Sequence, residues 1–187
     1  MPTASVRISK FLARILRHQP HAAGLNLDPN GWADIDAVLS AVTAKHGPVS
    51  FEQLVHLVET NDKRRYELSS DRRRIRAAQG HSIPVDLALA PAQPPPILYH
   101  GTQASSVPSV MRNGLLKGRR NHVHLSTDIE TALAVGRRRS GDTAVLMIRS
   151  GDMTAHDFFL SANGVWLTDH VPPQFIAPLD GARLPSG

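Results

Sequence analysis

The chain has 187 residues and a formal charge of +5, from 21 Lys and Arg against 16 Asp and Glu, and it contains no cysteine. The absence of cysteine excludes disulfides, thiolate metal sites and cysteine nucleophiles. A pI near 10.2 is compatible with a polyanionic partner, but it also fits a basic protein kept soluble by its charge. No stretch approaches the roughly 18 apolar residues of a membrane span and the N-terminus lacks a secretory pattern, so we expect a soluble, cytoplasmic monomer.

The first segment has the periodicity of an amphipathic helix. One helical face carries Ile8, Phe11, Leu12, Ile15 and Leu16. This spacing predicts a helix over residues 4–17, which Pro20 stops. The run Asp28-Pro29-Asn30-Gly31 then predicts a tight turn.

Two further helices and a hairpin follow in the first half. Asp34 is placed to cap one helix, and Ser50 with Gln53 has the capping-box pattern of another. Residues 66–68 and 75–78 are predicted to pair as a short β-hairpin. Three helices followed by a hairpin is the order of a winged helix, a common nucleic-acid-binding design. We therefore expect a winged-helix lobe over residues 1–88.

The pattern changes after residues 84–96, which are rich in Pro and Ala and predict a linker. Strands are predicted at 97–100, 122–125, 144–148, 165–167 and 175–176, and helices at 106–112 and 128–137. This pattern predicts a second lobe over residues 89–187, of the α+β class, with a mainly antiparallel sheet.

Basic residues recur at the breaks between elements: Arg17 and His18, Lys63 to Arg65, Arg76, Arg119 and Arg120, and Arg137 to Arg139. Arginine grips phosphate in a bidentate way, and histidine moves protons. These residues indicate a phosphate-processing site, with a solvated basic surface as the alternative. We expect Lys63, Arg76 and His81 to contact the substrate, although His81 also fits a cap on the hairpin.

His100-Gly101-Thr102 follows a predicted strand and opens a loop. Glycine lets a ligand approach the backbone, and His and Thr can bond hydroxyl groups. His122 and His124 face one side of a strand, but no third ligand has metal-site spacing, so a core or cleft position is favoured over a metal. Phosphate-binding glycine fingerprints and carboxylate pairs are missing, which disfavours kinases, dehydrogenases and glycosidases.

Six blocks now occur together and in order: LRHQP at 16–20, DKRRYEL at 62–68, IRAAQGHS at 75–82, YHGT at 99–102, RNHVHLS at 120–126 and NGVWLT at 163–168. Over roughly residues 5–180 the chain resembles the RNA 2′-phosphotransferase family (KptA type). The resemblance implies a winged-helix RNA lobe joined to an ADP-ribosyltransferase-like lobe that binds NAD as co-substrate, with no metal.

The resemblance also implies site residues. The family's Arg-His-Arg-Arg catalytic set falls on Arg17, His18, Arg65 and Arg120, with Arg64 as the alternative to Arg65. These are expected around the phosphate between the lobes, with Arg120 supplied by the C-terminal lobe. The implied NAD contacts are His100, Gly101, Thr102, His122, Ser126, Arg138 and Asn163, with Arg137 and Arg139 as alternatives to Arg138.

The implied reaction has two steps. The RNA 2′-phosphate is first ADP-ribosylated as nicotinamide leaves, and it is then released as ADP-ribose 1″,2″-cyclic phosphate, leaving RNA with a 2′-hydroxyl. Two alternatives stay open at this stage. One is an ADP-ribosyltransferase that stops after the first step and caps terminal nucleic-acid phosphates. The other is a non-catalytic winged-helix binder of nucleic acid.

Overall fold

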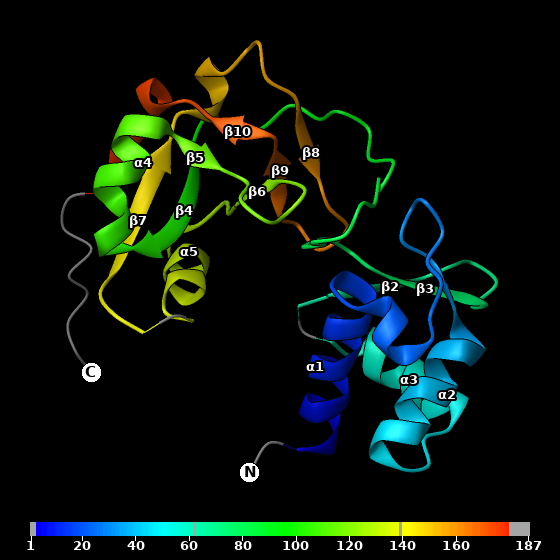
Figure 1. The fold of residues 1–187 in the computed structure, drawn as a ribbon. Helices are drawn as coiled ribbons and strands as arrows, with labels where there is room; N and C mark the ends of the chain where they lie inside the picture. Colours follow the sequence, from blue (N-terminus) through cyan, green and yellow to red (C-terminus); the bar gives the residue numbers. More distant parts are fainter. Residues whose placement is uncertain (1–2, 62, 139, 180–187) are drawn as a thin grey trace. The chain divides into compact units, whose positions relative to one another are not determined.

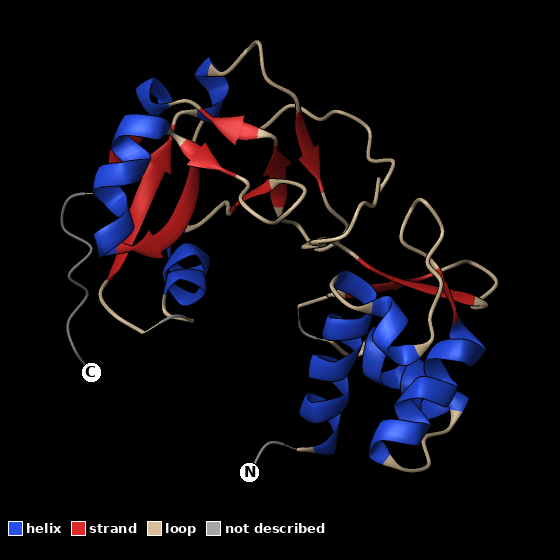
Figure 2. Cartoon of the chain, viewed as in Figure 1, coloured by secondary structure: helices blue, strands red, loops and turns tan. Residues whose placement is uncertain are grey.

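The computed structural model describes residues 3–61, 63–138 and 140–179, and it divides into two compact units (Figure 1). Unit 1 runs to Leu89 and also contains Arg119–Asn121, whereas unit 2 contains Ala90–Gly118 and the chain from His122 onward. Arg120 therefore lies with unit 1, although the sequence pattern placed it in the C-terminal lobe. Both units mix helices with small antiparallel sheets, and unit 1 is the more helical (Figure 2). None of the described helices is long and apolar enough to cross a membrane.

Unit 1 contains the three predicted helices: α1 (Ala4–Arg17), α2 (Ile35–His46) and α3 (Phe51–Glu59). The predicted caps are confirmed. The N–H of Ala37 donates to Asp34 Oδ1 over 2.9 Å. Ser50 and Gln53 form both bonds of the capping box at the start of α3. These side chains satisfy backbone N–H groups that a helix start leaves without an intrahelical acceptor.

A three-stranded antiparallel sheet with the order β1-β3-β2 completes unit 1. Its strands are β1 (Ala33–Asp34), β2 (Tyr66–Leu68) and β3 (Arg74–Ala77), and a 3-10 turn, η1 (Pro20–Ala23), follows α1. The predicted hairpin is therefore confirmed as β2 and β3. The predicted turn is confirmed as well, because the N–H of Gly31 donates to Asp28 O over 2.9 Å and Gly31 has φ +81°.

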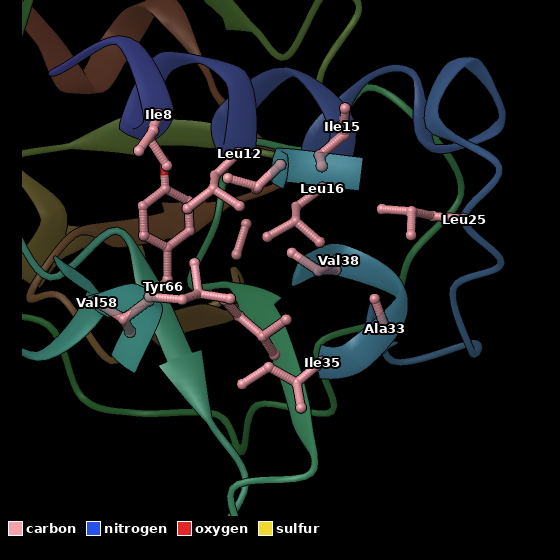
Figure 3. Packing of buried hydrophobic residues seen from close by; sticks show 14 of the residues in the cluster. Ile8, Leu12, Ile15, Leu16, Leu25, Ala33, Ile35, Val38, Val58 and Tyr66 are labelled. Carbon is pink, nitrogen blue, oxygen red and sulfur yellow. The ribbon is translucent and has the colours of Figure 1, made fainter. Parts of the chain in front are cut away.

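The core of unit 1 lies between α1, α2, α3 and the hairpin. Figure 3 shows the side chains of Ile8, Leu12 and Leu16 on α1 gathered with Val38 and Tyr66. Leu12, Leu16 and Val38 are fully buried. Burying each such aliphatic side chain stabilises the fold by about 1.5–3 kcal/mol. The core therefore holds the C-terminal end of α1, where Arg17 and His18 lie, in a fixed position.

The predicted linker at 84–96 contains the boundary between the two units, and several of its residues make specific contacts within one unit or the other. Val85 and Leu87 are buried, and the N–H of Asp86 donates to Pro29 O within unit 1. In unit 2, the N–H of Ala92 donates to Phe158 O over 2.8 Å. Apolar side chains and backbone pairing outweigh the linker-like composition of this stretch.

Unit 2 contains two three-stranded antiparallel sheets, with the orders β11-β7-β4 and β6-β9-β8, and a short pair, β10-β5. The strands are β4 (Leu98–Gln103), β5 (Leu115–Leu116), β6 (Val123–Leu125), β7 (Thr143–Ile148), β8 (Phe158–Leu160), β9 (Trp166–Thr168), β10 (His170–Val171) and β11 (Ile176–Pro178). The five strands predicted from the sequence are confirmed with shifted ends. β5, β8 and β10 were not predicted.

The helices α4 (Val107–Asn113) and α5 (Ile129–Gly136) pack on opposite faces of the β11-β7-β4 sheet (Figure 1). Leu146 and Ile148 belong to the same apolar cluster as α4, whereas Val145 packs with α5. This follows from strand geometry, in which successive side chains point to opposite faces. The 3-10 turns η2 (Ala104–Ser106), η3 (Ser150–Asp152) and η4 (Pro173–Phe175) complete the unit.

Candidate active site

The candidate site in unit 1 begins where α1 ends. Arg17 is the last residue of α1 and His18 is its C-cap. The N–H of Ser82 donates to Arg17 O over 2.9 Å, and Ser82 Oγ lies 2.9 Å from His18 Nδ1 in a hydrogen bond whose direction depends on the tautomer. A Cβ on Gly80 would lie 3.5 Å from Arg17 Nη1. The segment 80–82 thus bonds the Arg17 backbone and the His18 ring, and Gly80 lies beside the Arg17 guanidinium.

Arg65 lies beside Arg17. Asn61 Oδ1 accepts from the backbone N–H and from Nη1 of Arg65, both over 3.3 Å. Arg17 Nη2 donates to the Arg65 carbonyl over 3.4 Å. Arg64, the alternative in the sequence analysis, is exposed and has a left-handed φ of +39°. This geometry favours Arg65 over Arg64 as the partner of Arg17 in the site.

Asn121 fixes the neighbouring Arg120 to unit 1. Its N–H donates to His81 O over 3.3 Å, and its Nδ2 donates to Ile83 O over 3.1 Å and to Val85 O over 3.0 Å. Because Asn121 follows Arg120 directly, these bonds hold the Arg120 backbone beside the segment that also carries Ser82. Asn121 and Ser82 were not predicted as site residues, although both lie within the six sequence blocks.

Burial and neighbouring charges shift the pKa values of His18 and of the nearby Tyr66. Partial burial lowers the pKa of His18 below its usual 6.5, and the charges of Arg17 and Arg120 lower this pKa further. The imidazole is therefore mainly neutral at pH 7. Burial raises the pKa of the nearby Tyr66, whose O–H donates to Ser9 O in the middle of α1, so the phenol stays protonated.

Two of the three predicted substrate contacts, Arg76 and His81, are bonded to or buried by other groups of the protein. Arg76 donates to Glu67 Oε2 from Nη2 over 2.9 Å and to Leu87 O from Nη1 over 3.3 Å, and its guanidinium carbon lies 4.5 Å from the centre of the Trp32 ring. His81 is only 2% exposed. These positions favour packing roles for Arg76 and His81. Lys63 is exposed, close to Arg65 in the chain.

In unit 2, the predicted NAD contacts His100 and Ser126 are brought together. His100 Nδ1 lies 3.0 Å from His124 O in a hydrogen bond. Tyr99 and Ser126 exchange both backbone hydrogen bonds over 2.8 Å each. The strand β4 and the end of β6 are thus joined at His100 and Ser126. Thr102 lies further along β4, where it pairs with Ala144.

Gly101 has a structural explanation that the sequence did not reveal. A Cβ at Gly101 would lie 1.7 Å from Ala132 O on α5. A side chain there is impossible without moving the helix, because real Cβ contacts are never that short. The glycine therefore permits the close packing of α5 on β4, which accounts for it without a ligand.

The remaining predicted contacts are spread over the β6-β9-β8 sheet. The register Leu125↔Trp166↔Leu160 places Ser126 and the turn with Asn163 at the same end. In that turn, Ser161 Oγ donates to Asn163 Oδ1 over 2.8 Å. His122 precedes β6 at the other end, and its ring centre lies 5.9 Å from that of Phe159.

Arg138 is exposed just after α5, as is Arg137, and Arg139 lies outside the described residues. His122 and His124 do not belong to a metal site in the part of the chain that the structure describes, where no cluster of three or more His, Asp and Glu side chains suits a metal ion. The predicted contacts of unit 2 thus offer imidazole, hydroxyl, amide and guanidinium groups.

Arg17, Arg65 and Arg120 thus lie in unit 1 together with a histidine of lowered pKa, and such a set of side chains suits a phosphate group. The comparisons with known proteins agree. Residues 3–170 match the RNA 2′-phosphotransferase, Tpt1 / KptA family. The chain belongs to this family, as the six sequence blocks indicated.

Curated relatives cover nearly the whole chain, and three of them share the name "Probable RNA 2′-phosphotransferase". One from Hahella chejuensis is 49% identical over 174 residues, which are 92% of this chain and 93% of that protein. One from Rhizobium rhizogenes is 47% identical over 187 residues, or 98% and 100% of the two chains. One from Streptomyces coelicolor is 48% identical over 174 residues, or 92% and 94%. These names support an RNA 2′-phosphotransferase activity.

Proposed function

We propose that this protein removes an internal 2′-phosphate from RNA and transfers it to NAD. The products are RNA with a 2′-hydroxyl, nicotinamide and ADP-ribose 1″,2″-cyclic phosphate, formed through an ADP-ribosylated phosphate. The observation that supports this most directly is the grouping of Arg17, His18 and Arg65 with the Arg120 segment in unit 1 of a chain from the RNA 2′-phosphotransferase family. In this proposal unit 1 is a winged-helix RNA lobe and unit 2 is an ADP-ribosyltransferase-like NAD lobe.

The arginines of the site bind the phosphate. Guanidinium groups form paired hydrogen bonds with phosphate oxygens and stay charged at any pH the protein meets. Arg17, Arg65 and Arg120 hold the substrate phosphate and stabilise the charge that develops when the RNA oxygen leaves phosphorus. Asn61 and Asn121 hold the backbones of Arg65 and Arg120, so these cations need little rearrangement during the reaction.

His18 moves the proton. Its Nδ1 is engaged with Ser82 Oγ, which leaves Nε2 as the atom that exchanges a proton with an oxygen of the reacting phosphate. A pKa below 6.5 keeps the ring mainly neutral at pH 7 but within reach of protonation. The attacking phosphate oxygen is already anionic at neutral pH, so the first step needs no strong base.

The predicted contacts of unit 2 fit a dinucleotide in their chemistry. His100, Thr102, Ser126 and Asn163 present imidazole, hydroxyl and amide groups that hydrogen-bond ribose hydroxyls, and Arg138 is exposed for a diphosphate. The His100 ring is bonded to His124 O and the Ser126 backbone pairs with Tyr99, which positions both residues for binding. NAD supplies the ribose carbon that the phosphate attacks and the ribose hydroxyl that finally receives it.

One incubation separates this proposal from its alternatives. The protein is mixed with NAD and an RNA carrying a single internal 2′-phosphate, and the products are separated by chromatography. ADP-ribose 1″,2″-cyclic phosphate with 2′-hydroxyl RNA supports the proposal. A stable ADP-ribosylated RNA favours the enzyme that caps nucleic-acid phosphates. Absence of nicotinamide release contradicts both enzymatic activities and leaves the nucleic-acid binder.

A further inference from the structure

A groove with a volume of about 740 Å³ lies in unit 1 between α1 and α3, and we call it the α1–α3 groove. One side is formed by α1 from Ala4 to Arg17, and the other by α3 with the chain that precedes and follows it. Arg17 and Arg65 belong to its lining, so the groove is continuous with the candidate phosphate site. It extends from there to the N-terminal end of α1, beyond every residue that the proposed reaction uses.

The charge of the α1–α3 groove has one sign. Its lining contains the cations Arg7, Lys10, Arg17, Lys63 and Arg65. No Asp or Glu occurs among the described residues that line it. Arg7 and Lys10 are exposed and have no part in the phosphate site. A row of cations leading away from a phosphate site is the arrangement that tracks a nucleic-acid backbone.

The lining also contains apolar side chains, interspersed with polar ones such as Ser9 and Gln53. Val6 is 43% exposed, and Val49 and Leu57 are half-buried, so part of this apolar surface is open in the groove. Apolar surface beneath a cationic rim suits a strand whose bases lie on the surface while its phosphates reach the rim. A volume of about 740 Å³ falls within the range of clefts that hold ligands of nucleotide size.

We infer that the α1–α3 groove binds the single-stranded RNA next to the 2′-phosphate, with Arg7 and Lys10 contacting backbone phosphates one or more nucleotides from the reacting group. The inference rests on the proposed function, because it assumes that the 2′-phosphate lies at Arg17 and Arg65. It adds a binding surface that selects longer RNA over the minimal reacting unit.

The test compares substrates of different length. One substrate is a dinucleotide with the 2′-phosphate at its internal linkage, and two hexanucleotides extend it in the 5′ or the 3′ direction. We expect the wild-type protein to process at least one hexanucleotide with a higher kcat/KM than the dinucleotide. In the double variant Arg7→Glu/Lys10→Glu this preference should fall by about tenfold or more, because phosphate contacts dominate such affinity. The preference that remains in the double variant should also depend less steeply on salt concentration than the preference of the wild type.

A matched control is Lys45→Glu/Arg73→Glu, which changes the net charge equally at exposed positions of unit 1 outside the groove lining. The control should keep the wild-type preference. The milder variant Lys10→Gln, measured with the same substrates, serves if the double variant does not fold. The inference that the groove binds RNA is contradicted if the folded groove variants keep the wild-type preference for longer RNA, or if the control loses it equally. It is also contradicted if the wild type processes all three substrates with the same kcat/KM. Failure of the wild type to dephosphorylate any of the three substrates contradicts the proposed function instead.

Discussion

His18 Nδ1 lies 2.9 Å from Ser82 Oγ, while the N–H of the same serine donates to the carbonyl of Arg17. One residue from a segment distant in sequence therefore positions the two residues at the end of α1. The segment continues through Ile83 and Val85, whose carbonyls accept from Asn121. The chain from 81 to 85 thus links the end of α1 to Arg120.

Ser82→Ala removes the hydrogen bond that orients the His18 ring. Because Ser82 is exposed, we expect little change in stability. The proposed proton transfer should slow, with kcat falling about tenfold and KM for RNA nearly constant, since a misplaced catalytic group costs rate more than binding. Steady-state kinetics measure both constants. A kcat equal to that of the wild type would exclude the positioning role.

His18→Ala should lower the rate of phosphate release by about 100-fold or more, because general acid–base catalysis contributes at that scale. NAD binding, measured by calorimetry, should persist because the predicted NAD contacts lie in unit 2. His21→Ala is the control, as an exposed histidine in η1. Full activity in His18→Ala would remove His18 from the mechanism.

The position of Arg120 is tested by the pKa of His18, read from the pH dependence of its imidazole NMR signals. The charge of Arg120 lowers this pKa. Removing that cation in Arg120→Gln makes the imidazolium easier to form, so the pKa of His18 should rise. Asn121→Ala should raise it as well if the Asn121 bonds hold Arg120 near His18. The adjacent, exposed Arg119 is the control: Arg119→Gln should change the pKa less.

A related consequence concerns stability and pH. The pKa of His18 is lower in the folded protein than the usual value of 6.5, so the unfolded chain binds the proton more readily. Protonation of His18 therefore leaves the free energy of unfolding unchanged well above pH 6.5. As the pH falls through 6.5, it lowers the free energy of unfolding increasingly. Denaturant titrations should show a shallower loss of stability in His18→Gln below that pH. Identical acid dependence in the two proteins would contradict the lowered pKa.

Gly101→Ala tests whether Gly101 serves packing. A Cβ 1.7 Å from Ala132 O forces α5 away from β4, which should cost about 1–3 kcal/mol or more even without NAD. Gly118→Ala is the control in the same unit, because nothing lies within 4 Å of a Cβ there and only its φ of +61° opposes the change. Thermal unfolding of both variants compares them. Equal melting temperatures for Gly101→Ala and the wild type would favour a ligand role instead.

Local patterns predicted much of the fold. The helix over Ala4–Arg17, the caps Asp34 and Ser50, and the turn at Gly31 are encoded by residues close together in the chain, so periodicity and turn chemistry were sufficient. The two-residue strands β1, β5 and β10 were missed because so short a stretch has no measurable alternation. Their existence depends on partners distant in sequence, such as Ile75 for Ala33.

The residues of the candidate site also divide into those that local sequence patterns predict and those whose roles depend on contacts distant in sequence. Arg17 and His18 were predictable from a helix that ends at a basic pair. The roles of Asn121 and Ser82 were not, because hydrogen bonds to carbonyls many residues away leave no signature in sequence. Gly101 shows the converse, since a glycine beside a predicted ligand loop is explained by Ala132 on a helix that follows it by some thirty residues.

The fate of the phosphate tests the central claim most directly. An RNA is prepared with ³²P in its single internal 2′-phosphate and is incubated with the protein and NAD. The account predicts that the label leaves the RNA only when NAD is present and is recovered in ADP-ribose 1″,2″-cyclic phosphate. Label recovered as inorganic phosphate, or released without NAD, would contradict it.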